Sequence, residues 1–135
     1  ALQAAVYRFE VPGVPVAKAR ARVVNGHAYT PEATRAAEEA MGWAAEQAGV
    51  DVGDRPCAVT LWAYFPIPAS WSKARREAAR NGAQKHTRKQ DADNLLKLLD
   101  SCNGVAWVDD AQIVDARVIK AYSDKPRTVV EVRTL

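Results

Sequence analysis

One run of nine residues constrains the fold of this chain more than any other. Residues 57–65 (Cys-Ala-Val-Thr-Leu-Trp-Ala-Tyr-Phe) are almost all apolar or β-branched, and Pro66 and Pro68 follow directly. A short run of this composition that ends at prolines is typical of a β-strand. We therefore expect the rest of the chain to build a sheet around this strand.

Further segments carry strand patterns. Residues 5–11 alternate apolar and polar side chains, and residues of about 112–122 and 127–134 form two more candidates. Residues 23–29 contain Asn25-Gly26 between two short apolar pairs, the arrangement typical of a type I′ hairpin. The sheet is therefore expected to combine segments from both ends of the chain.

Helices are expected between these strands. The first should begin with Thr30 as its N-cap and Pro31 at the first helical position, and it should end at Gly49. A second, strongly basic helix should begin with Ser70 as its N-cap and run to about residues 81–82.

A third helix is expected to begin near Asp93 and to stop at Asn103-Gly104. Its apolar residues recur at the spacing of a helix packed on a sheet: Leu95, Leu98, Leu99 and Cys102. The resulting order predicts a single domain over residues 1–135 of the α/β class, an α+β two-layer arrangement with helices packed on a small mixed sheet.

The charge distribution indicates a polyanionic partner. The chain has a net charge of +3, and residues 73–97 carry eight Lys or Arg against three acids. That stretch is therefore +5 while the remaining chain is −2, so the positive charge is concentrated in one segment. Two cysteines without a CxxC pair, and only two histidines, argue against structural zinc. Without a long apolar run or a signal-peptide pattern at residues 1–5, we expect a cytoplasmic protein with no membrane association.

An acidic cluster follows the basic stretch. In an extended segment Asp91 and Asp93 point the same way, and a helix beginning at Asp93 places Lys97 one turn further along. Asp100 and the pair Asp109-Asp110 are further carboxylates that this arrangement brings within reach. Carboxylate oxygens are the ligands that Mg²⁺ and Mn²⁺ prefer, and a neighbouring lysine suits a phosphate substrate. The residues alone leave an alternative open, in which Asp93 is an N-cap and Asp109-Asp110 a turn.

The motifs resemble those of a known family, the RusA Holliday junction resolvases. The resemblance is carried by Asp91-x-Asp93-Asn94-x-x-Lys97-x-x-Asp100, Asn103-Gly104, Trp107-x-Asp109-Asp110-x-Gln112-Ile113 and Lys120. It extends to Pro12-Gly13-x-Pro15-x-x-Lys18-x-Arg20-x-Arg22, Tyr29-Thr30-Pro31 and Ser70-Trp71-Ser72-Lys73. The pattern departs from the family at Gln90, where proline is expected, and at Ala92, where a larger apolar residue is expected.

The resemblance implies a homodimeric nuclease that nicks two opposed strands of a four-way DNA junction with Mg²⁺, for which Mn²⁺ can substitute. Asp91, Asp93 and Asp110 would then be catalytic carboxylates and metal ligands, with Asp109 as a further candidate ligand. Lys97 would be the catalytic lysine.

Basic residues on both sides of the acidic cluster are candidates for phosphate contacts that position DNA without determining sequence. They are Lys18, Arg20, Arg22, Lys73, Arg75, Arg76, Arg80, Lys85, Arg88 and Lys89. Trp71 and Trp107 are expected to be packing residues. Two other functions remain open at this point: a less selective metal-dependent nuclease on branched DNA, and a non-catalytic basic domain that binds nucleic acid.

Overall fold

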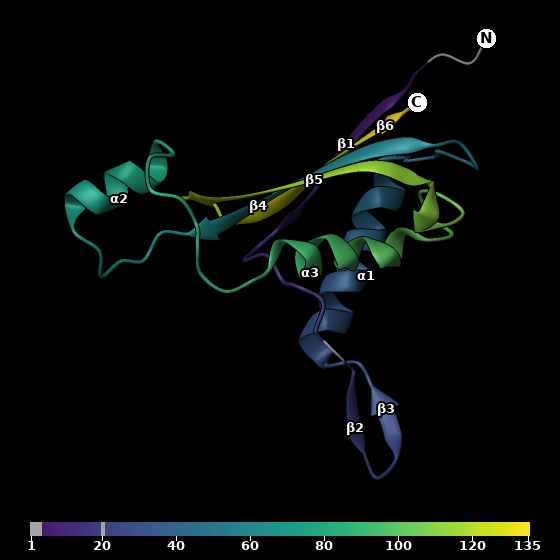
Figure 1. Cartoon of the computed structure of the whole chain (residues 1–135), viewed down its shortest axis with the longest axis horizontal. Helices are drawn as coiled ribbons and strands as arrows, with labels where there is room; N and C mark the ends of the chain where they lie inside the picture. The colour runs from purple at the N-terminus through teal and green to yellow at the C-terminus, as the bar shows by residue number, and fades with distance from the viewer. Residues whose placement is uncertain (1–3, 20) are drawn as a thin grey trace.

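The computed structural model describes residues 4–19 and 21–135, and it contains a four-stranded mixed sheet (Figure 1). The strand order is β1 (Val6–Pro12), β6 (Arg127–Thr134), β4 (Cys57–Pro66) and β5 (Ile113–Ser123). β6 is antiparallel to both of its neighbours, whereas β4 and β5 are parallel. The predicted strands are thus confirmed, and β4 lies in the interior of the sheet.

Two of the helices cover one face of this sheet. α1 (Glu32–Gln47) and α3 (Ala92–Lys97) lie on the same side of it (Figure 1). Alternate residues of β4 are buried in one apolar core with Met41 of α1 and Leu95 of α3, and Trp62 on the opposite face is only half-buried. The alternation follows from the strand period of two, and it confirms the predicted two-layer α+β arrangement.

The prediction for the start of α1 was wrong by one residue. Pro31, not Thr30, occupies the N-cap position, and no side chain caps the helix. The backbone of Pro31 has an extended ψ of 142°, so the first helical residue is Glu32. At the other end Gly49 adopts a φ of 68°, and its N–H donates to the carbonyl of Glu46 as in a Schellman motif.

The N-cap of α2 (Lys73–Arg80) also differs from the prediction. Ser72, not Ser70, accepts a hydrogen bond at Oγ from the backbone N–H of Arg75 (3.2 Å). Ser70 lies in a preceding turn, which is closed by the N–H of Trp71 donating to the carbonyl of Pro68 (3.2 Å). A turn that begins at Pro68 therefore separates the end of β4 from the start of α2.

The third helix begins at Ala92 and tightens after Lys97 into a 3₁₀ segment, η1 (Leu98–Cys102). All members of the predicted apolar stripe are buried: Leu95, Leu98, Leu99 and Cys102. η1 packs closely on α1, because a Cβ on Gly42 would lie 3.3 Å from the carbonyl oxygen of Ser101. A second 3₁₀ segment, η2 (Asp110–Gln112), precedes β5.

The predicted hairpin is present as β2 (Arg22–Val24) and β3 (His27–Tyr29). Asn25 and Gly26 adopt φ values of 51° and 78°, as both central residues of a type I′ turn must. The hairpin projects beyond the N-terminal end of α1, away from the sheet (Figure 1).

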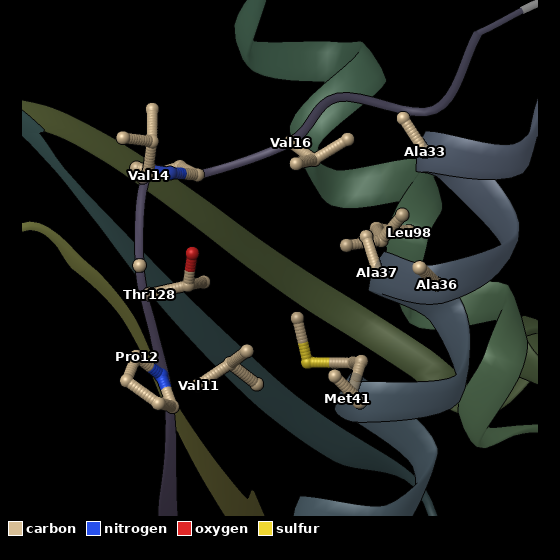
Figure 2. Close-up of a pocket in the computed structure, with 13 residues that line it drawn as sticks. Val11, Pro12, Val14, Val16, Ala33, Ala36, Ala37, Met41, Leu98 and Thr128 are labelled. Atoms are coloured by element: carbon tan, nitrogen blue, oxygen red, sulfur yellow. The ribbon is translucent and has the colours of Figure 1, made fainter.

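An apolar hollow of about 250 Å³ lies between the loop after β1 and α1 (Figure 2). Val11, Val16, Met41 and Leu98 are among its lining residues, none of which is titratable. The hollow therefore offers no acid–base or metal-binding group. No helix within the described residues is long and apolar enough to cross a lipid bilayer.

Candidate active site

Asp91 and Asp93 line a hollow of about 500 Å³ at the start of α3. Lys97, one turn further along the helix, and Lys18, in the loop before β2, line the same hollow. The structure therefore brings two of the predicted carboxylates and the predicted catalytic lysine to one surface depression.

The two carboxylates differ in their local roles. Asp91 occupies the N-cap position of α3, but its side chain makes no capping hydrogen bond. Asp93 lies within the first turn, so the alternative that made it the N-cap was wrong. Its Oδ2 is 3.9 Å from Nζ of Lys97, and both side chains are largely exposed, at 71% and 59%. An exposed pair of this length contributes little to stability, so both groups remain accessible to a ligand.

Lys18 anchors the N-terminal loop to the third helix. Its backbone N–H donates to the carbonyl of Asn94 (2.9 Å), and its Nζ donates to Oδ2 of Asp100 (3.2 Å). The lysine and its partner are 82 residues apart in the sequence, so no local pattern indicated this contact. As a result, one wall of the hollow is formed by a loop that is fixed at two points.

Asp110 lies at a neighbouring hollow of about 210 Å³. Asp100 and Lys97 line it as well, together with apolar residues of β5 and the third helix. Lys97 thus belongs to both hollows and lies between the Asp91–Asp93 pair and Asp110. The predicted catalytic residues occupy adjacent depressions rather than one.

The pKa values of Asp109 and Asp110 are shifted in opposite directions, which indicates different roles for the two residues. Contacts with the carboxyls of Asp109 and then of Asp100 raise the pKa of Asp110 to about 6. The pKa of Asp109 is lowered instead, because its carboxylate accepts a hydrogen bond from the backbone N–H of Ala111 (2.9 Å) and one from Asp110. Asp109 therefore serves as the cap of η2, which favours a turn role for it.

Gln112 supports the same turn. Its Oε1 accepts hydrogen bonds from the backbone N–H groups of Val108 and Asp109, both at 2.9 Å. Its Nε2 donates to the carbonyls of Gly53 and Arg55, both at 2.8 Å. The glutamine in the Asp-Asp-x-Gln motif thus holds the segment that carries Asp110 against the loop before β4.

The donor set fits a hard divalent cation in its chemistry, since it offers exposed carboxylate oxygens and no thiolate. Within residues 4–19 and 21–135, however, no group of three or more His, Cys, Asp or Glu side chains is arranged to hold a metal ion. Asp93 and Asp100 each have a lysine partner in this arrangement, Lys97 and Lys18 respectively.

Comparison with known proteins identifies the family of this chain. Residues 12–133 match the family model of endodeoxyribonuclease RusA. The chain belongs to the RusA family. A protein of Bacillus subtilis (strain 168) named "Uncharacterized protein YqaN" is 34% identical over 134 residues, which cover 93% of this chain and 94% of that protein.

Membership of the RusA family makes the protein an endonuclease that hydrolyses phosphodiester bonds, in a family of Holliday junction resolvases that act on branched DNA. RusA nucleases are in general metal-dependent. The resemblance deduced from the motifs is thereby confirmed, and the alternative of a non-catalytic binding domain is set aside.

The departure from the RusA pattern at Gln90 coincides with an unusual backbone. Gln90 has a φ of 92°, which non-glycine residues rarely adopt and which the ring of proline forbids. Just before it, Nζ of Lys120 donates to the carbonyl of Arg88 (2.8 Å) and ties the segment to β5. The backbone before Asp91 therefore has a conformation that a proline at position 90 could not adopt.

One of the predicted DNA contacts of this RusA protein, Arg80, already has partners within the protein. Its guanidinium forms ion pairs with Asp124 (2.9 Å) and Glu77 (3.2 Å). This pairing within the protein argues against its predicted DNA contact.

Trp71 is a packing residue, as expected. It is buried, the guanidinium of Arg75 lies 3.7 Å from its ring centroid, and the ring of Tyr122 meets it edge-on at 5.2 Å. Arg88 lies over the same ring at 5.4 Å. Trp107 is also buried, and its Nε1 donates to Oδ1 of Asn103 (2.8 Å).

The other predicted DNA contacts differ in how far they are exposed to solvent. Arg20 lies outside the described residues. Arg76 is half-buried, and its Nε has no hydrogen-bond partner among the described residues. The exposed members are Arg22, Lys73, Arg75, Lys85, Arg88 and Lys89. Lys89 lines a further hollow, of about 420 Å³, together with Lys18 and Asp91.

Proposed function

We propose that this RusA protein resolves four-way junctions by paired, symmetric nicks, with Mg²⁺ as the metal and Mn²⁺ as a substitute. The observation that carries the proposal is the position of Lys97, which lines both the hollow of Asp91 and Asp93 and the hollow of Asp110. The scissile phosphate would bind where these two depressions meet.

In this proposal Asp91, Asp93 and Asp110 would hold the metal through their carboxylate oxygens, and they would have to approach one another to do so, because among the described residues no three such side chains are arranged for a metal ion. A cation bound there would supply charge stabilisation at the phosphoryl group and lower the pKa of a water molecule. Lys97 would exchange its partner Asp93 for the phosphate and stabilise the charge that develops there. Lys18, on the facing wall, holds the loop that bounds the phosphate site.

The exposed basic residues would guide DNA into this site. α2 projects beyond the end of the sheet, and the segment that follows it leads to Asp91 (Figure 1). Lys85, Arg88 and Lys89 lie on this segment and can bind successive phosphates without distinguishing bases.

A homodimer is part of the proposal. A four-way junction has two-fold symmetry, and a dimer with the same symmetry presents two active sites to opposed strands. Paired nicks follow if each site cuts one strand.

The test is cleavage of a strand-labelled four-way junction with Mg²⁺, beside a linear duplex of the same arm sequence. Wild-type protein should nick two opposed strands of the junction and leave the duplex intact. Asp93→Asn and Asp91→Asn should abolish cleavage while largely retaining junction binding, because each variant removes a carboxylate but keeps the side-chain shape. Asp54→Asn, at an exposed aspartate outside the site, is the matched control and should cut at the wild-type rate.

Equal cleavage of the junction and the duplex would keep the chemistry and refute junction selectivity. Cleavage by Asp93→Asn at the wild-type rate would refute the assignment of that carboxylate. A single nick per junction at saturating protein would refute the paired mechanism.

A further inference from the structure

The β2–β3 hairpin exposes an unusual share of the apolar surface of the chain. Among the described residues ten large hydrophobic side chains are exposed, and three of them are Val23 (70%), Val24 (52%) and Tyr29 (45%). Every residue from 22 to 29 is exposed, so no residue of the hairpin belongs to the buried core. A two-stranded ribbon of this length is only marginally stable alone, and apolar groups on it point to a binding role.

The strand register defines the two faces of the hairpin. Arg22 is paired with Tyr29 and Val24 with His27, which places these four side chains on one face. Val23 and Ala28 share the other face. One face thus combines a cation, an aromatic ring and an imidazole with an aliphatic group, and such groups together contact phosphates and base surfaces.

The base of the hairpin is continuous with the active site. Ala21, the residue before β2, lines the same hollow as Asp91 and Asp93. Just upstream, the N–H of Ala19 donates to Oγ1 of the buried Thr34 (3.2 Å) in α1. A short connection then links β3 to α1, so both ends of the hairpin meet fixed parts of the protein. The hairpin therefore begins at the edge of the hollow in which a phosphate of the DNA would bind.

We propose that the β2–β3 hairpin packs against exposed base pairs at the branch point of the DNA and thereby provides selectivity for branched substrates. Arg22 binds a backbone phosphate, while Val24 and Tyr29, which share its face of the hairpin, cover base surfaces. In a linear duplex these surfaces become accessible only by unstacking, which costs a few kcal/mol per step, whereas the arms of a junction interrupt the stack at the branch. The inference rests on the function proposed above and adds the element that recognises the branch.

The test measures binding without divalent metal, by fluorescence anisotropy, to a four-way junction and to a linear duplex of the same arm sequence. The variant is Val24→Thr/Tyr29→Thr, which changes two apolar groups on one face of the hairpin, because threonine has the β-branched shape that favours a strand and carries a hydroxyl in place of apolar surface. Val6→Thr, at a valine on β1 that is 61% exposed, is the matched control.

We expect the double variant to lose about tenfold in junction affinity and less than twofold in duplex affinity. The control should bind both substrates like the wild type. Arg22→Gln should weaken binding to both substrates and lower the salt dependence by about one unit of slope, because it removes a phosphate contact.

A junction preference that survives in the double variant would refute the role of the hairpin and leave the proposed junction selectivity of the protein intact. An equal loss on both substrates would show a general contact and also overturn it. A change in sedimentation mass without a change in affinity would assign the hairpin to an interface between two copies of the chain, against the proposal. Wild-type protein that binds both substrates equally would refute the proposed junction selectivity itself, and the hairpin's role with it.

Discussion

Nζ of Lys18 lies 3.2 Å from Oδ2 of Asp100, and this contact joins the N-terminal loop to the helical segment that carries the candidate active site. Both side chains are partly exposed, at 31% and 38%, so the pair contributes at most about 1 kcal/mol to the free energy of unfolding. Its position matters more than its strength, because Lys18 lines the hollow of Asp91 and Asp93.

Lys18→Met should therefore reduce junction cleavage by about tenfold, which corresponds to about 1.4 kcal/mol in the activation barrier. The variant keeps the backbone hydrogen bond to Asn94 but loses the tie to Asp100 and a positive charge beside the phosphate. Its urea midpoint should change little. Lys125→Met, in the turn before β6, is the control and should cut normally. A loss of activity that only matches a loss of folded protein would contradict this role.

The backbone at Gln90 leads to a prediction that separates two substitutions. Gln90→Gly should preserve or slightly raise stability, because glycine adopts a φ of 92° without strain. Gln90→Pro should lower the free energy of unfolding by about 1–3 kcal/mol and reduce cleavage, since proline requires a φ near −65°. Urea denaturation and junction cleavage test both. A proline variant as stable as the wild type would show that the chain reaches Asp91 by another path.

Much of this architecture was predictable because it depends on local periodicity. The apolar run at residues 57–65 indicated a strand, the apolar stripe from Leu95 to Cys102 indicated a helix with one buried face, and the structure confirms both. The hairpin was predictable from Asn25-Gly26, because few residue pairs suit its turn. Helix starts were less predictable, since Ser70 and Ser72 are equally good caps and only the turn after Pro68 distinguishes them.

The sequence indicated which residues gather at the candidate site, but it did not indicate how they are arranged there. The spacing of Asp93 and Lys97 places them on one helical face, as the structure shows. Contacts between distant segments left no local pattern, so the pairing of Lys18 with Asp100 was not deduced. Nor did any pattern show that Arg80 would bond Asp124 instead of remaining available to DNA.

Arg80 and Lys89 should consequently behave differently on DNA. Arg80→Gln should leave the salt dependence of binding unchanged and lower stability slightly, because its guanidinium already pairs with Asp124 and Glu77. Lys89→Gln should weaken binding to all DNA and lower the slope of log K against log salt by about one unit. Anisotropy titrations at several salt concentrations measure both slopes. Equal reductions in the two variants would mean that Arg80 leaves its partners on binding.

His86 should make the stability of the fold depend on pH. Its ring stacks on Phe65 at 4.0 Å and lies 5.0 Å from Tyr122. Burial lowers the pKa of His86, and the charges of Lys120 and Arg88 lower it further. The folded protein therefore binds this proton less readily than the unfolded chain, whose histidine has an ordinary pKa of about 6.5.

The sign of the pH effect follows from this difference. Above the unfolded pKa the imidazole is neutral in both states, and its contribution to stability is fully present. As the pH falls through about 6.5 toward the folded pKa, the unfolded chain gains a proton that the folded chain does not, so the free energy of unfolding decreases. His86→Phe keeps a flat aromatic ring against Phe65 and cannot be protonated. Urea midpoints of the wild type and this variant should therefore diverge between pH 7.5 and pH 5.5, with the variant losing less. A parallel decline of the two proteins would show that His86 accepts its proton as easily when folded as when unfolded.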